Sequence, residues 1–289
     1  MNEAFFYSRA ENAAVKCELC PHNCLIPESK TGICGVRRNT GGKLYAASYG
    51  LVSSLALDPI EKKPLYRFHP GKKILSIGSF GCNLRCPFCQ NSDISMEYQY
   101  LWPKTNPTAP AYIAALATKA IPQGNLGVAY TYNEPLVGYE FVFDCAKLVR
   151  EAGLLNVLVT NGHLSRAPLE KMLPYIDAVN IDLKGFTDSF YKKLGCSLEA
   201  VKNTIEQCFR LCHVEITTLI IPEENDAEDE ITALAQWIAS LDPLIPLHLS
   251  RFFPRYRYAH KTATSRETIY RLSAIARNHL THVYTGNMG

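Results

Sequence analysis

Apolar and polar positions alternate in two rhythms from about Lys72 onward. Short runs rich in Val, Ile and Thr, several of them apolar throughout, predict buried strands at residues 73–79, 127–132, 156–161, 178–184, 213–221, 247–253 and 282–285. Runs with helical spacing of apolar residues lie between them, at residues 110–121, 136–151, 165–175, 198–212, 230–240 and 266–279. These β-α repeats predict a parallel sheet with right-handed crossovers, closed or partly closed as a barrel, with its chemistry at the carboxyl ends of the strands.

The first part of the chain does not follow this rhythm. We expect residues 1–71 to form a small cysteine-rich N-terminal subdomain packed on a barrel of residues 72–289. Its last segment is the loop DPIEKKPLYRFHPG at residues 58–71. We expect this loop to cover the mouth of the barrel and to leave charges such as Lys62 and Lys63 exposed.

Composition places the chain among ordinary globular proteins. Hydrophobic residues make up 47% and charged residues 20% of the sequence, which suits a folded domain with a large core. The formal net charge of +3 is too small to indicate a nucleic acid or a membrane as partner. The sequence has neither a secretory leader pattern nor an apolar run of membrane-spanning length, so we expect a cytoplasmic protein.

The chain has eleven cysteines, and their placement is more informative than their number. Seven lie in two tight clusters near the N-terminus, whereas Cys145, Cys196, Cys208 and Cys212 are scattered. Under reducing conditions disulfides are disfavoured, so tight clusters indicate metal sites. Cysteines in helical patterns are expected to be small buried residues.

The second cluster directly follows the first predicted barrel strand. Cys82, Cys86 and Cys89 have C-x3-C-x2-C spacing, and three thiolates on one loop can bind three irons of a 4Fe-4S cluster. No fourth cysteine lies nearby, so one iron remains open to chelate a substrate. Structural zinc is the alternative, but it prefers four ligands in paired spacing.

The match to a known family then extends along nearly the whole chain, through CELCPHNCLIP, GICGVRRN, DPIEKKPLYRFHPG, GSFGCNLRCPFCQN, YTYNEP, VTNG, NIDLKGF, HLSRFFP and YTGN. The sequence resembles the radical S-adenosylmethionine (SAM) enzymes of the AmmeMemoRadiSam system, relatives of pyruvate formate-lyase activating enzyme. The resemblance implies an incomplete (β/α)6-type barrel, with Cys82, Cys86 and Cys89 as cluster ligands. It also implies reductive cleavage of SAM to methionine and a 5′-deoxyadenosyl radical, which abstracts hydrogen from a substrate.

The end of the second barrel strand stands where radical SAM enzymes usually carry a Gly-Gly-Glu motif that binds the SAM amino group. Tyr132 and Asn133 replace the glycines here, so the loop backbone is expected to differ, but Glu134 keeps a suitable carboxylate. An acidic residue stabilised at a helix N-terminus is the alternative interpretation. We expect Asn133, with Thr160 and Asn161 at the end of the third strand, to share the SAM site.

The fourth barrel strand ends in Asn-Ile-Asp182-Leu-Lys184. By resemblance to the activating enzymes, Lys184 approaches the SAM carboxylate and Asp182 stands near it, through a monovalent cation in some relatives. Those relatives often have Asp before the Thr-Asn-Gly sequence, whereas this chain has Val159, which puts the cation in doubt. A purely structural Asp182–Lys184 pair is the alternative.

Cys17, Cys20, Cys24 and Cys34 form the other cluster, with C-x2-C-x3-C-x9-C spacing. Four clustered thiols favour a closed site for zinc, to which we lean, or for a second iron-sulfur cluster. An unmetallated group of cysteines is the third interpretation. Spacing alone does not choose between the two metals.

A basic and aromatic stretch follows the sixth predicted strand and includes Arg251 and Arg255. It suits a pocket for an anionic small substrate; nucleic-acid binding and a solvated loop are alternatives. His163, after Thr-Asn-Gly, is expected at the barrel mouth.

The leading interpretation is a radical SAM enzyme with an unidentified substrate. The resemblance implies a pathway shared with Memo-like and AMMECR-like proteins and a flavodoxin- or ferredoxin-type electron donor, and it does not suggest a nucleic-acid or membrane partner. A glycyl-radical-enzyme activase that acts on a partner protein is the alternative enzyme. A non-enzymatic iron-sulfur or zinc module is the third class.

Overall fold

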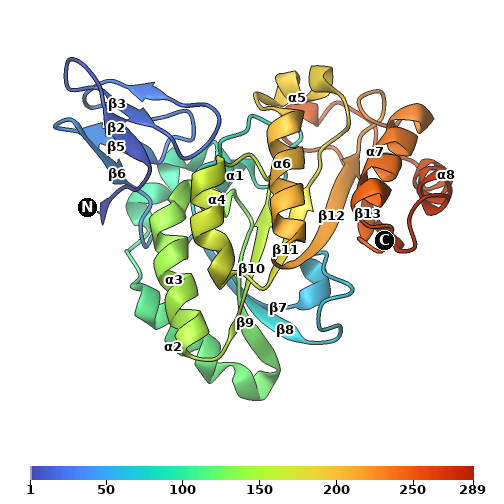
Figure 1. Ribbon diagram of the computed structural model, residues 1–289, viewed down its shortest axis with the longest axis horizontal. Coiled ribbons are helices and arrows are strands. Elements are labelled where there is room, and N and C mark those ends of the chain that lie inside the picture. The colour runs from blue at the N-terminus through green and yellow to red at the C-terminus, as the bar shows by residue number, and fades with distance from the viewer. Residues whose placement is uncertain (1) are drawn as a thin grey trace.

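The computed structural model describes residues 2–289 and is built around a sheet of eight strands (Figure 1). In chain order the strands are β7 (Ser54–Pro59), β8 (Lys73–Gly78), β9 (Asn125–Tyr130), β10 (Leu155–Thr160), β11 (Ala178–Asp182), β12 (His213–Ile220), β13 (Leu247–Arg251) and β14 (Val283–Gly286). Strands β8 to β14 are parallel neighbours in sequence order, and β7 pairs antiparallel with β8. The predicted α/β fold, a partial radical SAM-type barrel with a cysteine-rich N-terminal region, is confirmed, and all seven predicted strands are present.

Two short helices, α1 (Ser92–Ser95) and α5 (Asp188–Leu194), lie beside the loop that follows β8. The outer face of the sheet is covered by α2 (Pro110–Lys119), α3 (Tyr139–Glu151), α4 (Arg166–Met172), α6 (Leu198–Phe209), α7 (Glu228–Leu241) and α8 (Arg266–Arg277) (Figure 1). Outward-facing strand residues such as Val128 and Tyr130 pack with these helices in one large core. The sequence missed α1 and α5, which are too short to show a helical period. None of the helices in residues 2–289 has the length and apolarity needed to cross a bilayer.

Two small antiparallel sheets form the N-terminal region, at the upper left of Figure 1. One contains β1 (Asn2–Glu3), β5 (Arg37–Thr40) and β6 (Lys43–Ala46), and the other contains β2 (Tyr7–Arg9), β3 (Val15–Cys17) and β4 (Leu25–Ile26). Strand β7 also precedes residue 72, yet it is the edge strand of the barrel sheet. The sheet therefore extends into the segment that the sequence assigned to the N-terminal subdomain.

The loop between β7 and β8 closes the barrel at the amino ends of its parallel strands, whereas the sequence predicted that it covers the mouth at their carboxyl ends. Pro59 at the end of β7 pairs with Lys73 at the start of β8, so the loop lies at the amino ends of the parallel strands. Its apolar residues Ile60 and Leu65 pack against inward-facing strand residues such as Ala129. The expectation that this loop covers the barrel mouth was wrong, because its apolar side chains fill the interior that would otherwise be open below.

A buried carboxylate fixes this plug to the barrel. Glu215 on β12 is fully buried and accepts hydrogen bonds from the backbone nitrogens of Tyr66 (3.0 Å) and Arg67 (2.7 Å). The ring nitrogens of His213 and His248 lie 3.0 and 2.6 Å from its two oxygens. Burial acts to raise the pKa of Glu215, but these four hydrogen bonds lower it to about 2.

We predict that Glu215→Gln destabilises the folded protein by about 1–3 kcal/mol at pH 7, because an uncharged side chain loses charge-assisted hydrogen bonds in a buried site. The folded-state pKa is lower than the ordinary one, so the wild-type carboxylate stabilises the fold above pH 4.5 and loses this effect as the pH falls toward 2. Urea unfolding at several pH values measures both effects. Glu199→Gln, at a side chain that is 72% exposed, is the control. Equal stability of the Glu215 variant and wild type would contradict the role of this carboxylate.

Candidate active site

A cavity of about 650 Å³ opens at the carboxyl ends of the barrel strands. It collects the cysteines of the second cluster and all the side chains that the sequence assigned to SAM: Cys82, Cys86, Cys89, Asn133, Glu134, Thr160, Asn161, Asp182 and Lys184. These residues come from the ends of four neighbouring strands, β8 to β11. Parallel strands bring their carboxyl ends to one edge, so groups that are far apart in the sequence meet there.

The cysteine loop leaves β8 through Gly81, which has a φ of +87°. A Cβ at this position would lie 2.7 Å from the carbonyl oxygen of Cys34, so a side chain is excluded by both conformation and space. Farther along the loop, Phe88 stacks on Phe190 of α5 with ring centroids 6.2 Å apart. The backbone nitrogen of Arg85 donates to Leu194 O at 2.9 Å. Helix α5, which the sequence missed, therefore supports the loop from one side.

The three thiols lie in a desolvated setting. Burial raises the pKa of Cys86 to about 12 and also raises the pKa values of Cys82 and Cys89. A metal must therefore displace protons when it binds them. The donor set fits a 4Fe-4S cluster, which needs three thiolates that each bind a different iron. Among residues 2–289 no group of His, Cys, Asp or Glu side chains converges as the ligands of a single metal ion would.

Glu134 joins the ends of β9 and β10. One carboxylate oxygen accepts from the backbone nitrogen of Leu136 at 3.0 Å, and the other accepts from the nitrogen of Asn161 at 2.8 Å. The Thr160 hydroxyl lies 2.9 and 3.0 Å from the two oxygens. Burial raises the pKa of Glu134 to about 7 against the effect of these bonds. The side chain caps the 3-10 helix η5 (Pro135–Gly138), which is the alternative role considered from the sequence, and it also lines the cavity.

The residues that replace the usual two glycines have separate tasks. Asn133 accepts from Ser79 N and donates to Gly81 O, both at 2.9 Å, so it positions the start of the cysteine loop. Tyr132 has a φ of +71°, in the left-handed region that favours glycine. Tyr132 therefore adopts a conformation that glycine would also accept.

Asp182 and Lys184 form an ion pair with 2.6 Å between Oδ2 and Nζ, and both side chains are partly exposed in the cavity. Burial acts to lower the pKa of Lys184, but the charges of Asp182 and Cys86 raise it above its ordinary value. The ammonium therefore stays charged and faces the cysteine loop. A structural pair and a pair that binds a ligand share this geometry.

The sequence analysis missed a polar group at the floor of the cavity. Lys63 is only 3% exposed and binds Asp58 at 2.9 Å, whereas the neighbouring Lys62 is 67% exposed. The Tyr132 hydroxyl also donates to Asp58 at 2.9 Å, and the Lys63 ammonium lies 4.7 Å from the centre of the Tyr132 ring. Burial lowers the pKa of Lys63, whereas the bond from Lys63 lowers that of Asp58 to about 2 against the effect of burial. The expectation that both lysines are exposed was therefore wrong for Lys63.

Two arginines complete the cationic lining. Arg251, at the end of β13, and Arg255 both line the cavity, in the place that the sequence suggested for this stretch. The lining cations are Lys62, Lys63, Lys184, Arg251 and Arg255, against the side-chain carboxylates of Glu134 and Asp182. His163, by contrast, is buried beside His22 and is absent from the residues that line the cavity.

Comparison with known proteins identifies the family of this chain. The family model described as Radical SAM superfamily matches residues 76–235. The uncharacterized protein MJ0808 of Methanocaldococcus jannaschii is 40% identical over 291 residues, which cover 100% of this chain and 86% of the relative. The pyruvate formate-lyase-activating enzyme of Clostridium pasteurianum is 27% identical over 188 residues, which cover 58% of this chain and 72% of that enzyme.

Solved structures share the fold. A radical SAM methyltransferase from Sphaerobacter thermophilus matches with a TM-score of 0.55 and 17% identity, over 75% of this chain and 67% of that one. Streptococcus suis SuiB bound to S-adenosylmethionine matches with a TM-score of 0.53 and 14% identity, over 71% of this chain and 48% of that one. The family model spans more than half of the sequence and includes the cysteine loop and the strand ends around the cavity. This chain therefore belongs to the radical SAM superfamily of enzymes, which use a 4Fe-4S cluster and SAM.

Proposed function

We propose that this enzyme binds its 4Fe-4S cluster through Cys82, Cys86 and Cys89 and acts on a small anionic substrate held inside the barrel. When bound, the cluster supplies the electron that cleaves SAM to methionine and a 5′-deoxyadenosyl radical, which abstracts hydrogen from the substrate. The observation that carries the proposal is one cavity lined both by the three thiols and by a buried lysine at its floor. In this proposal SAM lies between the cluster and the substrate.

The methionine part of SAM is bound in this proposal by Glu134 and Lys184. Two carboxylate oxygens offer about four acceptor sites, and the donors around Glu134 fill three of them, so one remains for an ammonium group. The Lys184 ammonium has one hydrogen bond in the structure, to Asp182, and keeps two donors for a carboxylate. Asn133, Thr160 and Asn161 act mainly by holding the strand ends in place.

The substrate is anionic in this proposal because its end of the cavity carries more fixed positive than negative charge. Lys63 has one hydrogen-bond acceptor, Asp58, in the structure, and its position under the cavity leaves donors for a second anion. Arg251 and Arg255 offer planar donor groups that suit carboxylate or phosphate. The free energy lost when a lysine ammonium is removed from water must be compensated by an anionic partner.

The wider setting of the reaction follows from the family resemblance. We propose that the enzyme works in a pathway with Memo-like and AMMECR-like proteins and receives electrons from a flavodoxin- or ferredoxin-type donor. A glycyl-radical-enzyme activase is the second candidate, favoured by the similarity to activating enzymes. The two differ in what loses hydrogen: a small molecule in the first, a glycine of a partner protein in the second. A comparison of anionic metabolites in wild-type and deletion cells addresses this difference.

We predict that anaerobically reconstituted enzyme with SAM and dithionite yields 5′-deoxyadenosine, and that the combined variant Cys82→Ala, Cys86→Ala, Cys89→Ala yields none. The alanines remove the only thiols that line the cavity. Chromatographic measurement of 5′-deoxyadenosine tests this. Cys145→Ala, at a cysteine buried among helices, is the control and keeps full yield. An unchanged yield from the triple variant would refute the proposed cluster site.

Glu134→Gln and Lys184→Met are predicted to weaken SAM binding about ten- to a hundredfold, because each loses a charge-assisted hydrogen bond to the ligand. Titration of the reconstituted enzyme with SAM gives the affinity, and the iron content confirms that the cluster still assembles. Lys171→Met, on α4 and outside the cavity lining, serves as the control for a lost lysine charge. SAM affinity equal to that of wild type in both site variants would assign these residues to structure alone.

Lys63→Gln is predicted to weaken the binding of pyrophosphate and malonate, used as anion probes, at least tenfold in the presence of SAM. Lys72→Gln is the control, because this lysine lies in the same loop but is exposed and is not among the residues that line the cavity. Calorimetric titration of cluster-loaded enzyme measures both variants. Equal losses in the two variants, or no binding of either probe to wild type, would count against an anion site at Lys63.

A further inference from the structure

The four N-terminal cysteines are brought together by one hairpin and one loop. Cys17 ends β3, and its backbone nitrogen donates to the carbonyl oxygen of Cys24 at 2.9 Å, so the two cysteines face each other across the hairpin. Cys20 lies in the connecting turn. Gly32, two residues before Cys34, lies so close that a Cβ on it would be 3.6 Å from Cys24 Sγ.

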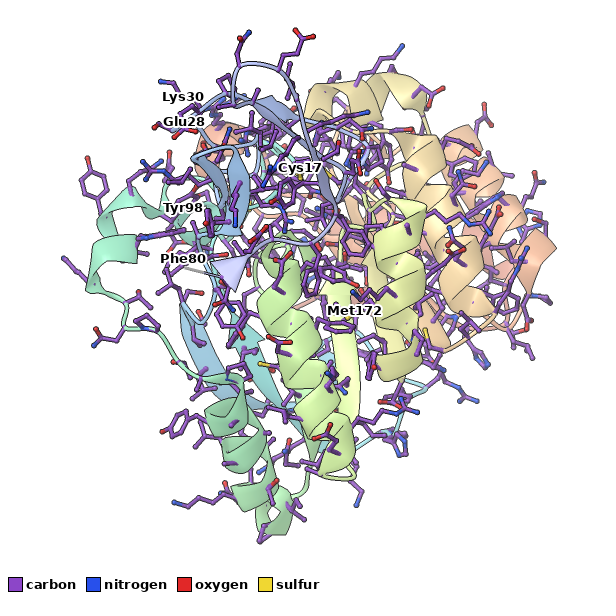
Figure 2. The ribbon with its side chains drawn as sticks, turned by 60° about the vertical axis from the view of Figure 1, so that its left-hand side comes forward. Cys17, Glu28, Lys30, Phe80, Tyr98 and Met172 are labelled. Carbon is purple, nitrogen blue, oxygen red and sulfur yellow. The ribbon has the colours of Figure 1, made fainter. Side chains whose placement is uncertain are left out.

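These thiols are shielded from water. Cys17, Cys20 and Cys34 are 6%, 9% and 9% exposed. All four cysteines are free of disulfides in the structure. Figure 2 shows Cys17 on the side of the N-terminal region that faces the barrel, away from Glu28 and Lys30 at its outer edge. A zinc ion, to which the sequence analysis leaned, needs thiolates that converge on one point, and no such group is found among residues 2–289. An iron-sulfur cluster instead takes each thiolate on a different iron, so four reduced thiols spread around one small region suit it.

A buried arginine points to a ligand in this pocket. Arg37 is 1% exposed and forms an ion pair with Glu140 at 3.1 Å. Its Nε has no hydrogen-bond partner among residues 2–289. The guanidinium lies beside the thiols of Cys17 and Cys34. A buried donor without an acceptor is costly, and a metal-bound thiolate is an acceptor that would satisfy it.

The pocket is also connected to the catalytic loop. The Asn83 side chain, next to Cys82, lies beside Cys20 and accepts from Asn161 Nδ2 at 2.8 Å. The same Asn161 nitrogen lies 3.7 Å from Cys82 Sγ. His22, in the N-terminal hairpin turn, contacts Asn83 O at 2.7 Å. Two asparagines therefore link one cysteine group to the other.

We propose that Cys17, Cys20, Cys24 and Cys34 bind a second iron-sulfur cluster, which positions the catalytic cysteine loop through Asn83. This centre is closed to SAM because four thiolates complete its coordination. It goes beyond the proposed reaction, since it adds a site with no part in binding SAM or substrate. Binding of the metal also orders a region that has only short strands of its own.

The metal is tested in the variant that lacks Cys82, Cys86 and Cys89, so that the catalytic site contributes nothing. Anaerobically purified and reconstituted protein should hold about four irons per chain, and X-ray absorption at the iron edge should show sulfur ligands. Adding Cys24→Ser, at the most exposed of the four, should remove this iron, whereas adding Cys212→Ser should not. Absence of iron from the triple variant would refute the site, whatever the activity of the wild-type enzyme.

The coupling is tested in chains that keep the catalytic cysteines. Cys24→Ser and Asn83→Ala should each change the electron paramagnetic resonance spectrum or the reduction potential of the reduced catalytic cluster, because each alters the link to Cys82. Leu25→Ala, beside Cys24 and 65% exposed, should leave both unchanged. The iron content must first show that the catalytic cluster is present. A spectrum and potential equal to those of wild type after loss of the N-terminal metal would refute the positioning role.

Discussion

The active site depends on asparagine side chains that hold an irregular loop in place. The cysteine loop has little regular secondary structure, so its position comes from side chains on neighbouring strand ends. Asn133 holds Gly81 at its start, and Asn91 within the loop donates to the carbonyl oxygen of Tyr132 at 2.7 Å. Asn161 binds Asn83 from the next strand. Because an asparagine side chain is uncharged, these residues fix the loop without adding a net charge beside its three thiols.

The lysines that line the cavity each form an ion pair with a carboxylate. Lys63 is held by Asp58 and Lys184 by Asp182. A buried ammonium alone would lose its proton or destabilise the fold, whereas a paired one stays charged with donors to spare. In the proposed function, these charged lysines attract anions before any ligand is bound. One ion pair lies near the cysteine loop and the other at the floor of the cavity.

Much of this structure could be predicted from the sequence, and each element or residue that was missed or misplaced has a physical reason. The seven parallel strands and the residues at their ends follow from local patterns, because period and strand order dictate where they meet. Helix α5 was missed because its seven residues are too few to show a period. Lys63 and the loop after β7 were misplaced because their burial depends on partners distant in sequence. Glu215 is one such partner, about 150 residues from Tyr66.

Tyr132 shows how these distant contacts bear on the chemistry. A tyrosine with a φ of +71° is strained, and such strain persists only where surrounding bonds compensate it. Here Asp58 accepts from its hydroxyl and Asn91 of the cysteine loop donates to its carbonyl oxygen. The strained residue therefore connects the floor of the cavity to the loop that carries Cys82, Cys86 and Cys89. A glycine would fit the backbone but would lose the hydroxyl and the ring beside Lys63. The tyrosine side chain thus ties the floor of the cavity to the cysteine loop.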